Sequence, residues 1–235
     1  MPVPQGLPMK ASTLSIVMPV LNEAAGLGAA LIALAPFRAR GVQLIISDGN
    51  SGDGTAELAH ATGATVIITP RGRALQMNAG AQQASAGVLL FLHADTFLPE
   101  DADQLIARTL ANGKVIWGRF DVRIAGPSRM LRVIAALMNL RSRWSGIATG
   151  DQAIFMTRAA FDAVGGFPAQ PLMEDIEICR RLLRLSRPAC LRAKVLTSGR
   201  RWGTRGVWRT ILLMWRLRFA YWRGAAPEYL ARLYR

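Results

Sequence analysis

Residues 14–23 read LSIVMPVLNE, an apolar run that gives way to polar residues. Two later runs have the same form, QLIISD at residues 43–48 and VLLFLHAD at residues 88–95, and each finishes on an aspartate, Asp48 or Asp95. Short Val/Ile/Leu/Phe runs separated by Ala-rich stretches are typical of buried parallel strands joined by helices. In such a sheet, ligands bind outside the carboxyl ends of the strands. We therefore expect both carboxylates to face one cleft, where they could hold a nucleotide and a divalent cation.

The order of these runs predicts an α/β doubly wound fold with a mostly parallel central sheet. Strand-like and Ala/Leu-rich segments alternate as βαβαβαβ in the first part of the chain. The expected strands are residues 14–20, 42–47, 65–69 and 88–92, and the expected helices are residues 24–35, 56–61 and 71–84. Asn22 is expected to cap the first helix, and Pro36 to lie beyond its end. The later part is mixed, with expected strands at 114–122 and 153–156, a helix at 130–140 and a helix after Glu174.

Length and composition indicate a globular protein with one substantial core. The chain has 235 residues, of which 51% are hydrophobic, and no uncharged apolar stretch of the roughly 18 residues that a spanning helix needs. Its first ten residues, MPVPQGLPMK, lack the charged start and long apolar core of a secretion signal. Cys179 and Cys190 have no metal-type spacing, and two cysteines do not suggest a disulfide scaffold. A cytoplasmic location is therefore expected.

The net charge of +14 is unevenly distributed. Residues 1–100 carry five Lys/Arg and six Asp/Glu, whereas residues 101–235 carry 24 and nine. From Arg180 to Arg235 there are 15 basic residues, with Glu228 as the one acid. A polyanion, a phospholipid surface or a phosphorylated substrate could each explain this excess.

The two aspartates have distinct expected roles. Asp48 opens a glycine-rich loop, SDGNSGDGT, in which a carboxylate can accept a hydrogen bond from a base N–H or a ribose hydroxyl. Asp53 in the same loop reads as part of a helix-capping turn and is expected to be structural. Asp95 follows an apolar strand, where Mg²⁺ or Mn²⁺ could be held with help from water and diphosphate. His93 could be a metal ligand, a phosphate donor or a packing residue.

Several motifs, taken in order, resemble one enzyme family. They are IVMPVLNE, SDGNSGDGT and FLHADT, then RALQMNAG at 73–80, GDQ at 150–152 followed by AIFMTRAAFDAVGGF, MED at 173–175 and RRW at 200–202. The ordered set resembles the family 2 inverting glycosyltransferases with the GT-A fold. The resemblance covers residues 12–205 as a glycosyltransferase domain and leaves residues 206–235 as a basic, amphipathic C-terminal segment.

The resemblance implies a nucleoside diphosphate sugar as donor, with a UDP-sugar as the first expectation, and a small or lipid-like acceptor. It implies donor-binding roles for Pro19, Asn22, Glu23, Asp48, Arg73, His93, Asp95, Arg201 and Trp202. It implies an acceptor-side segment at Gly150, Asp151 and Gln152, and Mg²⁺ or Mn²⁺ on Asp95. Arginine suits the diphosphate because its planar fork pairs with two phosphate oxygens at once.

Inverting transfer needs a base that activates the acceptor hydroxyl on the face opposite the leaving nucleoside diphosphate. Asp175 is the candidate catalytic base, and Glu174 the neighbour that orients it. The alternative is that Glu174, Asp175 and Glu177 only complement the positive end of a helix.

Three departures from the family pattern narrow the expected function. Gly49 replaces the usual second acid of the first loop, and His93 replaces the first acid of the family's Asp-x-Asp motif. Ser198 stands where processive synthases of the family carry glutamine. We therefore expect transfer of a single sugar and not polymer synthesis. The His-Ala-Asp-Thr combination is similar to that of a small bacterial subgroup of the family.

The segment GTRGVWRTILLMWRLRFAYWR at residues 203–223 predicts an amphipathic helix. Four arginines (Arg205, Arg209, Arg216, Arg223) fall on one face, and Val207, Trp208, Ile211, Trp215, Phe219 and Trp222 fall on another. Such a helix either packs on the domain or lies in a membrane interface, on the cytoplasmic side, with its arginines on anionic lipid.

Two other functions remain open on sequence grounds. A sugar nucleotidyltransferase also uses an α/β sheet and an acidic metal site, but it usually has a glycine- and arginine-rich loop after the first strand. A catalytically impaired, membrane-associated relative would explain the loss of one acid at the metal motif. Nucleic acid is not an expected partner, because the basic tail carries no recognition motif.

Overall fold

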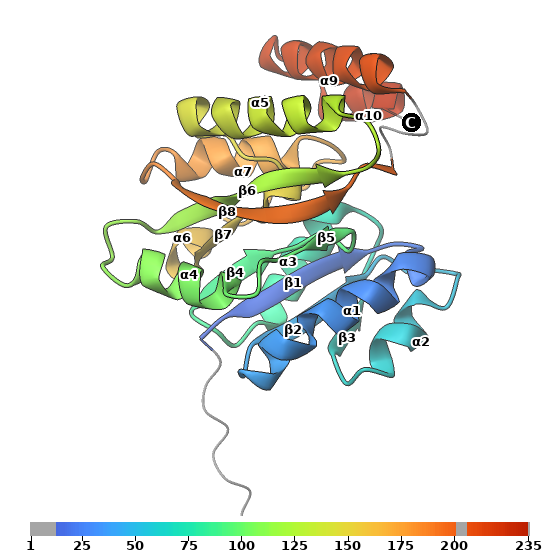
Figure 1. The fold of residues 1–235 in the computed structure, drawn as a ribbon, viewed down its shortest axis with the longest axis vertical. Coiled ribbons are helices and arrows are strands. Elements are labelled where there is room, and N and C mark those ends of the chain that lie inside the picture. The colour runs from blue at the N-terminus through green and yellow to red at the C-terminus, as the bar shows by residue number, and fades with distance from the viewer. Residues whose placement is uncertain (1–12, 201–205, 235) are drawn as a thin grey trace, which may run out of the picture.

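The computed structural model describes residues 13–200 and 206–234 of the chain. Their strands form one eight-stranded sheet in the order β3-β2-β1-β4-β7-β6-β8-β5, with helices on both faces (Figure 1). The first half of this sheet consists of four parallel strands: β1 (Ser15–Val20), β2 (Gln43–Asp48), β3 (Thr65–Ile68) and β4 (Val88–Phe91). The α/β fold with a mostly parallel sheet is therefore confirmed.

The helices between these strands are α1 (Ala24–Ala39), α2 (Thr55–His60) and α3 (Arg73–Gln83). The prediction that α1 stops before Pro36 was wrong. The helix continues for one more turn because the side chain of Phe37 is buried in the core. Asn22 does not cap α1 either: its φ is +54°, and its side-chain Oδ1 accepts a hydrogen bond from Gly52 N at 3.0 Å.

The second half of the sheet mixes strand directions. It contains β5 (Thr96–Phe97), β6 (Trp117–Ala125), β7 (Phe155–Thr157) and β8 (Ala189–Ser198). Strand β7 is antiparallel to β4 and β6, β8 is parallel to β6, and β5 is antiparallel to β8. The strand expected at 114–122 begins and ends three residues later, because β6 pairs with β8 as far as Ala125 and Ser198. Strands β5 and β8 and the helices α4 (Ala102–Leu110) and α6 (Arg158–Ala163) were not predicted.

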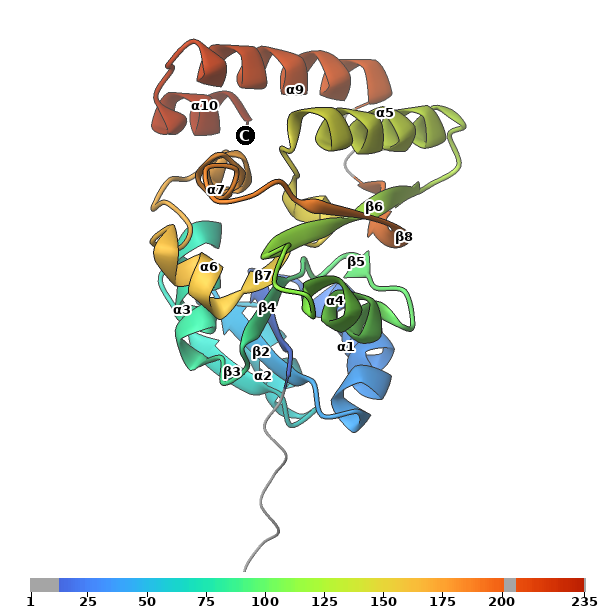
Figure 2. The same cartoon turned by 90° about the vertical axis from the view of Figure 1, so that its left-hand side faces the viewer.

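Side chains from the two faces of the sheet form two hydrophobic clusters. In β1, Ile16 and Met18 point into the first cluster and Val17 into the second, as alternation along a strand requires. Helices α1, α4 and α5 (Met130–Ser145) pack on the first cluster, and α3, α6 and α7 (Glu174–Leu182) pack on the second. Figure 2 shows these two groups of helices on opposite sides of the strands.

The C-terminal segment forms two helices, α9 (Val207–Trp222) and α10 (Pro227–Tyr234). They pack on each other and on the start of α7 through a third cluster centred on Met173, Leu217 and Leu230. Figures 1 and 2 place α5, α9 and α10 at the end of the molecule away from β3. Across residues 13–200 and 206–234, no helix combines the length and apolar character needed to cross a membrane. The division at residue 205 stays a prediction.

Candidate active site

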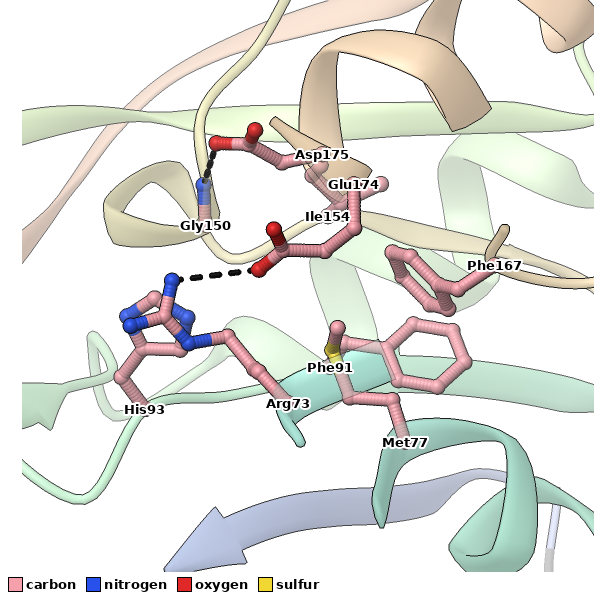
Figure 3. A pocket seen from close by; sticks show the side chains of 9 residues that line it. All are labelled: Arg73, Met77, Phe91, His93, Gly150, Ile154, Phe167, Glu174 and Asp175. Carbon is pink, nitrogen blue, oxygen red and sulfur yellow. Dashed lines mark hydrogen bonds and ion pairs between the residues drawn. The ribbon is translucent and has the colours of Figure 1, made fainter. Parts of the chain in front are cut away.

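A pocket lies beside the carboxyl end of β4. Its lining residues are Arg73, Met77, Phe91, His93, Gly150, Ile154, Phe167, Glu174 and Asp175. They come from the first two turns of α3, the end of β4 and the loop after it, the short 3₁₀ turn η1 (Gly150–Gln152), the residue before β7, the loop before α7 and the first turn of α7. Arg73 and His93 approach from one side of the pocket, and Glu174 and Asp175 from the other (Figure 3). The pocket therefore joins a basic wall to an acidic one.

The basic wall depends on the close packing of α3 against the sheet. Gly80 on α3 faces Val17 and Ser47 so closely that a Cβ atom there would overlap both side chains. This contact fixes the helix whose first residue is Arg73. The Arg73 Nη1 atom lies 3.1 Å from Glu174 Oε1, across the pocket. Burial opposes the charge on Arg73, but the charges of Glu174, Asp175 and Asp151 outweigh it, so the pKa of the Arg73 guanidinium is raised.

The acidic wall is the first turn of α7. Met173 precedes it with a φ of +67°, a left-handed conformation that turns the chain into the helix. Asp175 Oδ2 accepts a hydrogen bond from Gly150 N at 3.1 Å, and its Oδ1 accepts one from Ile176 N at 2.8 Å. Burial, followed by the neighbouring charge of Glu174, raises the pKa of Asp175 to about 6. A carboxylate poised near neutral pH is suited to exchange a proton with a substrate.

His93 belongs to the pocket and faces the turn η1. Its Nδ1 lies 3.4 Å from Asp151 Oδ1, and its ring fills the space that a Cβ atom on Gly150 would occupy. The neighbouring Gln152 does not reach the pocket. Its side-chain amide donates to Ser142 Oγ at 3.0 Å on α5, and its Oε1 accepts from Thr149 N at 3.3 Å.

Asp48 ends β2 and is fully buried. Its Oδ1 accepts a hydrogen bond from Ser51 N at 2.6 Å, while its Oδ2 is buried without a hydrogen-bond partner among the described residues. A buried carboxylate oxygen is costly unless a donor meets it. The Asp48 carboxylate therefore has room for one more hydrogen-bond donor. The adjacent Gly49 leaves room for the Gln76 amide, which donates to Val20 O at 2.6 Å and Ser47 O at 2.8 Å.

The other donor-side residues surround this loop. Pro19 pairs with Ser47 between β1 and β2. Asp53 is structural, as predicted, because its Oδ2 accepts from Ala24 N at 3.1 Å and its Oδ1 from Thr55 N at 3.1 Å. Glu23 stands at the first position before α1, and its Oε2 lies 3.6 Å from Arg200 Nη2. Arg201 and Trp202 lie outside the described residues.

Asp95 follows β4 and is not part of the pocket lining. Its carboxylate has a long contact of 3.5 Å with the Thr96 hydroxyl, and its main-chain oxygen accepts from Ser198 N at 3.1 Å. No group of three His, Cys, Asp or Glu side chains suited to a metal ion occurs in residues 13–200 and 206–234. Mg²⁺ and Mn²⁺ sites often use one or two protein carboxylates and take the rest from phosphates and water. Asp95 fits a cation of this type that is shared with a diphosphate.

Sequence reasoning missed two features of the site. The first is an apolar wall of Met77, Phe91, Ile154 and Phe167, all buried, with the rings of Phe91 and Phe167 4.8 Å apart. The second is Arg141 on α5, whose Nε and Nη2 are buried without hydrogen-bond partners in the part of the chain that the structure describes. Burial lowers the pKa of Arg141, and the charge of Asp175 partly opposes this shift. Only the tertiary structure identifies this arginine as a neighbour of Asp175.

A mostly parallel, curled sheet with helices on both faces is the GT-A architecture found in glycosyltransferases. The model of glycosyl transferase family 2 matches residues 15–169, and the chain belongs to that family.

Individual relatives support this assignment. The chain is 31% identical over 176 residues to a "PGL/p-HBAD biosynthesis glycosyltransferase" of Mycobacterium bovis, an alignment that covers 68% of this chain and 64% of the relative. Among solved structures, it resembles a mannosyltransferase from Pyrobaculum calidifontis in complex with GDP-Man and Mn²⁺, with a TM-score of 0.67, 16% identity and coverage of 96% and 70%. It also resembles glucosyl-3-phosphoglycerate synthase from Mycobacterium tuberculosis with Mn²⁺, UDP and phosphoglyceric acid, with a TM-score of 0.59, 20% identity and coverage of 78% and 68%.

Proposed function

We propose that this protein is an inverting glycosyltransferase that moves a single sugar from a nucleoside diphosphate sugar, first of all a UDP-sugar, to a hydroxyl of a small or lipid-like acceptor. The observation that carries the proposal is Asp175, a carboxylate with a pKa raised to about 6 on the pocket wall opposite Arg73 and His93. Such a wall-to-wall arrangement supplies a base on one side of a sugar and positive charge on the other.

The donor would lie along the basic side. The Oδ2 of Asp48, which has no hydrogen-bond partner in residues 13–200 and 206–234, matches a donor such as the N3–H of uracil, which is why uridine is preferred. Arg73 pairs with Glu174 in the structure and would exchange this partner for phosphate oxygens. Asp95 would hold Mg²⁺ or Mn²⁺, which neutralises charge on a departing diphosphate. The two solved relatives described above, with UDP or GDP-Man and Mn²⁺, support this choice of cofactor.

In the proposed reaction, Asp175 accepts the proton of the acceptor hydroxyl. The acceptor oxygen then forms a bond to the anomeric carbon, and the bond from that carbon to the diphosphate oxygen breaks. Glu174 would keep Asp175 basic through its adjacent negative charge. The nucleoside diphosphate leaves with the electron pair, and the anomeric configuration inverts because attack and departure occur on opposite faces.

The direct test is donor hydrolysis and transfer with a panel of nucleotide sugars, with the anomeric configuration of the product followed by NMR. Calorimetric titration of UDP with and without Mn²⁺ accompanies it. We expect UDP binding that strengthens with Mn²⁺, and a product of inverted configuration. A retained configuration would contradict the role of Asp175, and no binding at millimolar UDP would contradict the uridine assignment. Turnover without any divalent ion would remove the role of Asp95.

A further inference from the structure

Two helices at one end of the molecule leave large apolar side chains in solvent. We name these two sets the α9 stripe and the α5 stripe. The α9 stripe consists of Trp208, Leu212, Trp215, Phe219 and Trp222, with 66%, 63%, 71%, 60% and 79% of each residue exposed. The α5 stripe consists of Val133, Leu137, Leu140 and Trp144, exposed by 50%, 58%, 64% and 84%. Their spacing of three and four residues puts each stripe along one side of its helix.

Neither stripe results from a loosely attached helix. The opposite side of α9 packs through Leu213 and Leu217 on the cluster that includes Met173 and Ile176 of the α7 region. The opposite side of α5 buries Leu131, Ile134 and Ala135 in the main core. Both helices lie at the same end of the molecule, α9 farther from the sheet than α5 (Figures 1 and 2), and each stripe is opposite the side of its helix that packs inward.

The structure changes the composition of the predicted apolar face of α9. Val207 and Ile211, which were expected on that face, pack against the main core. Leu212 takes their place in the exposed stripe. Arg218, which is partly buried, lies toward the side of Val207 and Ile211. The exposed face is therefore purely apolar and aromatic, and the α5 stripe adds a second face that sequence analysis did not identify.

The arginines beside the two stripes indicate the chemistry of the partner. Neither α5 nor α9 contains an aspartate or glutamate. Arg209, Arg216 and Arg223 are exposed along one border of the α9 stripe, and Arg132 is exposed on α5. Docking of a second copy through this face would bring arginines together without acids from these helices to pair them. An anionic lipid surface accepts both the arginines and the apolar side chains.

We infer that the α5 and α9 stripes together form one docking face for an anionic lipid bilayer. Both helices lie in the interface, with tryptophans at headgroup depth and arginines on lipid phosphates. The face extends beyond the C-terminal helix to α5, within the family domain. Because α9 packs on the α7 region, docking brings the helix that carries Asp175 near the lipid. If Asp175 is the base of the proposed function, this position favours a lipid acceptor. Only the choice of acceptor rests on the proposed function.

The test is co-sedimentation of the protein, without nucleotide, with phosphatidylcholine vesicles that contain increasing fractions of phosphatidylglycerol. Binding should rise with the anionic fraction and fall as salt is added. Leu137→Glu on α5 and Trp215→Glu on α9 should each weaken the partition coefficient by at least about tenfold, because each puts a charge into the apolar layer. Ile32→Glu is the matched control: Ile32 is 77% exposed on α1, outside the docking face, and its replacement should leave binding unchanged.

Charge is tested separately. Arg209→Glu with Arg216→Glu should weaken binding by more than about 25-fold, from roughly fivefold for each arginine removed. Arg108→Glu with Lys114→Glu changes the net charge equally, at exposed positions in and after α4, and should have a much smaller effect. UDP titration of every variant, in the absence of vesicles, reports folding and tests the donor site independently of lipid.

Four outcomes of the vesicle experiments would overturn the inference. The first is that the wild type does not bind anionic vesicles at low salt, and the second is that Ile32→Glu weakens binding as much as Leu137→Glu does. The third is that the two charge-reversal pairs weaken binding equally, and the fourth is that Leu137→Glu binds vesicles normally. Sedimentation velocity tests whether a second copy of the chain binds this face instead of lipid. A dimer that Leu137→Glu dissociates would assign the face to that second copy. A failure of UDP binding with intact vesicle binding would instead contradict the proposed function alone.

Discussion

The N-terminal region, residues 15–91, and the C-terminal region, residues 117–234, contribute to one sheet but differ in how their polar and charged side chains are paired. In the first region, the polar side chains of Asn22, Asp53 and Gln76 each form a hydrogen bond with the backbone of a neighbouring segment. In the second, charged groups are buried with incomplete partners, as at Arg141, or have a displaced pKa, as at Asp175. In the proposed function, the first region would hold the nucleoside of the donor at Asp48, and the second would supply the base, Asp175.

Two atoms depart from this contrast, the side-chain oxygens of the neighbouring residues Ser47 and Asp48. Ser47 Oγ and Asp48 Oδ2 are both buried without a hydrogen-bond partner among the described residues, whereas Asp48 Oδ1 and the main-chain oxygen of Asp48 each accept a hydrogen bond. Of the two, the carboxylate oxygen costs more to leave unpaired than the hydroxyl, so Asp48 Oδ2 is the stronger indication of a ligand contact. In the C-terminal region, an unsatisfied atom is less specific, because several charged groups there lie close together. The two regions should therefore respond differently to substitution.

The largest effect is expected from Asp175→Asn in the C-terminal region. The substitution keeps the shape of the side chain but removes the basic oxygen, so transfer should fall by roughly 100-fold or more. UDP affinity should stay within about a factor of three, because the change acts on chemistry and not on donor binding. Steady-state transfer and calorimetry measure the two quantities.

Glu177→Gln is the matched control for that variant. Glu177 lies in the same first turn, pairs with Arg180 and Arg181, and is not part of the pocket lining. If the acids of α7 served only the helix terminus, both variants would behave alike. Near-native turnover of Asp175→Asn would assign the base elsewhere, with Asp151 the next candidate.

The reverse response is expected from Asp48→Ala in the N-terminal region. Loss of a hydrogen bond to a charged group should weaken UDP binding by roughly tenfold to 100-fold, with a smaller effect on turnover of the bound donor. Asp103→Ala removes a carboxylate that pairs with Arg40 at 2.7 Å on the surface, and it should leave UDP binding unchanged. Equal UDP affinities in both variants would show that Asp48 only holds its own loop.

The third effect is the pH dependence of transfer. Burial and the charge of Glu174 raise the pKa of Asp175 to about 6. Since a general base must be ionised, the rate should be level above this value and fall by about tenfold per pH unit below it. Binding of UDP should not follow the same curve, and the residual activity of Asp175→Asn should lack the inflection. A wild-type profile that is flat from pH 5 to 8, from about one unit below to about two units above the expected pKa, would contradict the assignment.

Local sequence pattern was sufficient for the N-terminal region because its strands are buried, continuous apolar runs. Strands β1 to β4 begin and end within a residue or so of the expected positions. Strand β8 escaped prediction because ACLRAKVLTS carries Arg192 and Lys194 at positions that stay exposed while Val195 is buried. This segment forms a strand because it pairs with β6, about 70 residues earlier, and a local sequence pattern cannot predict such long-range pairing.

The residues of the site that belong to sequence motifs could be predicted, whereas those that only tertiary packing brings to the site could not. Family motifs pointed to Arg73, His93, Gly150, Glu174 and Asp175, and the structure brings these residues together around one pocket. Asp48 and Asp95, which were expected to face a shared cleft, do not line that pocket. The apolar wall resembles ordinary core in the sequence. The Nε and Nη2 atoms of Arg141, which have no hydrogen-bond partner among the described residues, can be recognised only when burial is known.

The smallest effect tests the packing that fixes the basic wall of the N-terminal region. Gly80 and Gly28 both lie inside helices, but a Cβ atom on Gly80 would overlap Val17 and Ser47, whereas one on Gly28 would meet nothing within 4 Å. Gly80→Ala should therefore lower the free energy of unfolding by about 1–3 kcal/mol. Gly28→Ala should raise it by up to about 1 kcal/mol, because alanine favours the helix.

Urea denaturation measures both changes, and UDP titration gives the functional reading. If α3 must lie close to the sheet to present Arg73, Gly80→Ala should also weaken UDP binding, by roughly the factor expected for a displaced charged contact, threefold to tenfold. Gly28→Ala should not affect UDP binding, because α1 contributes no side chain to the pocket lining. Equal free energies of unfolding for the two variants would show that the sheet shifts to accommodate the added methyl group on α3. The N-terminal region would then be less rigid than its hydrogen bonds indicate.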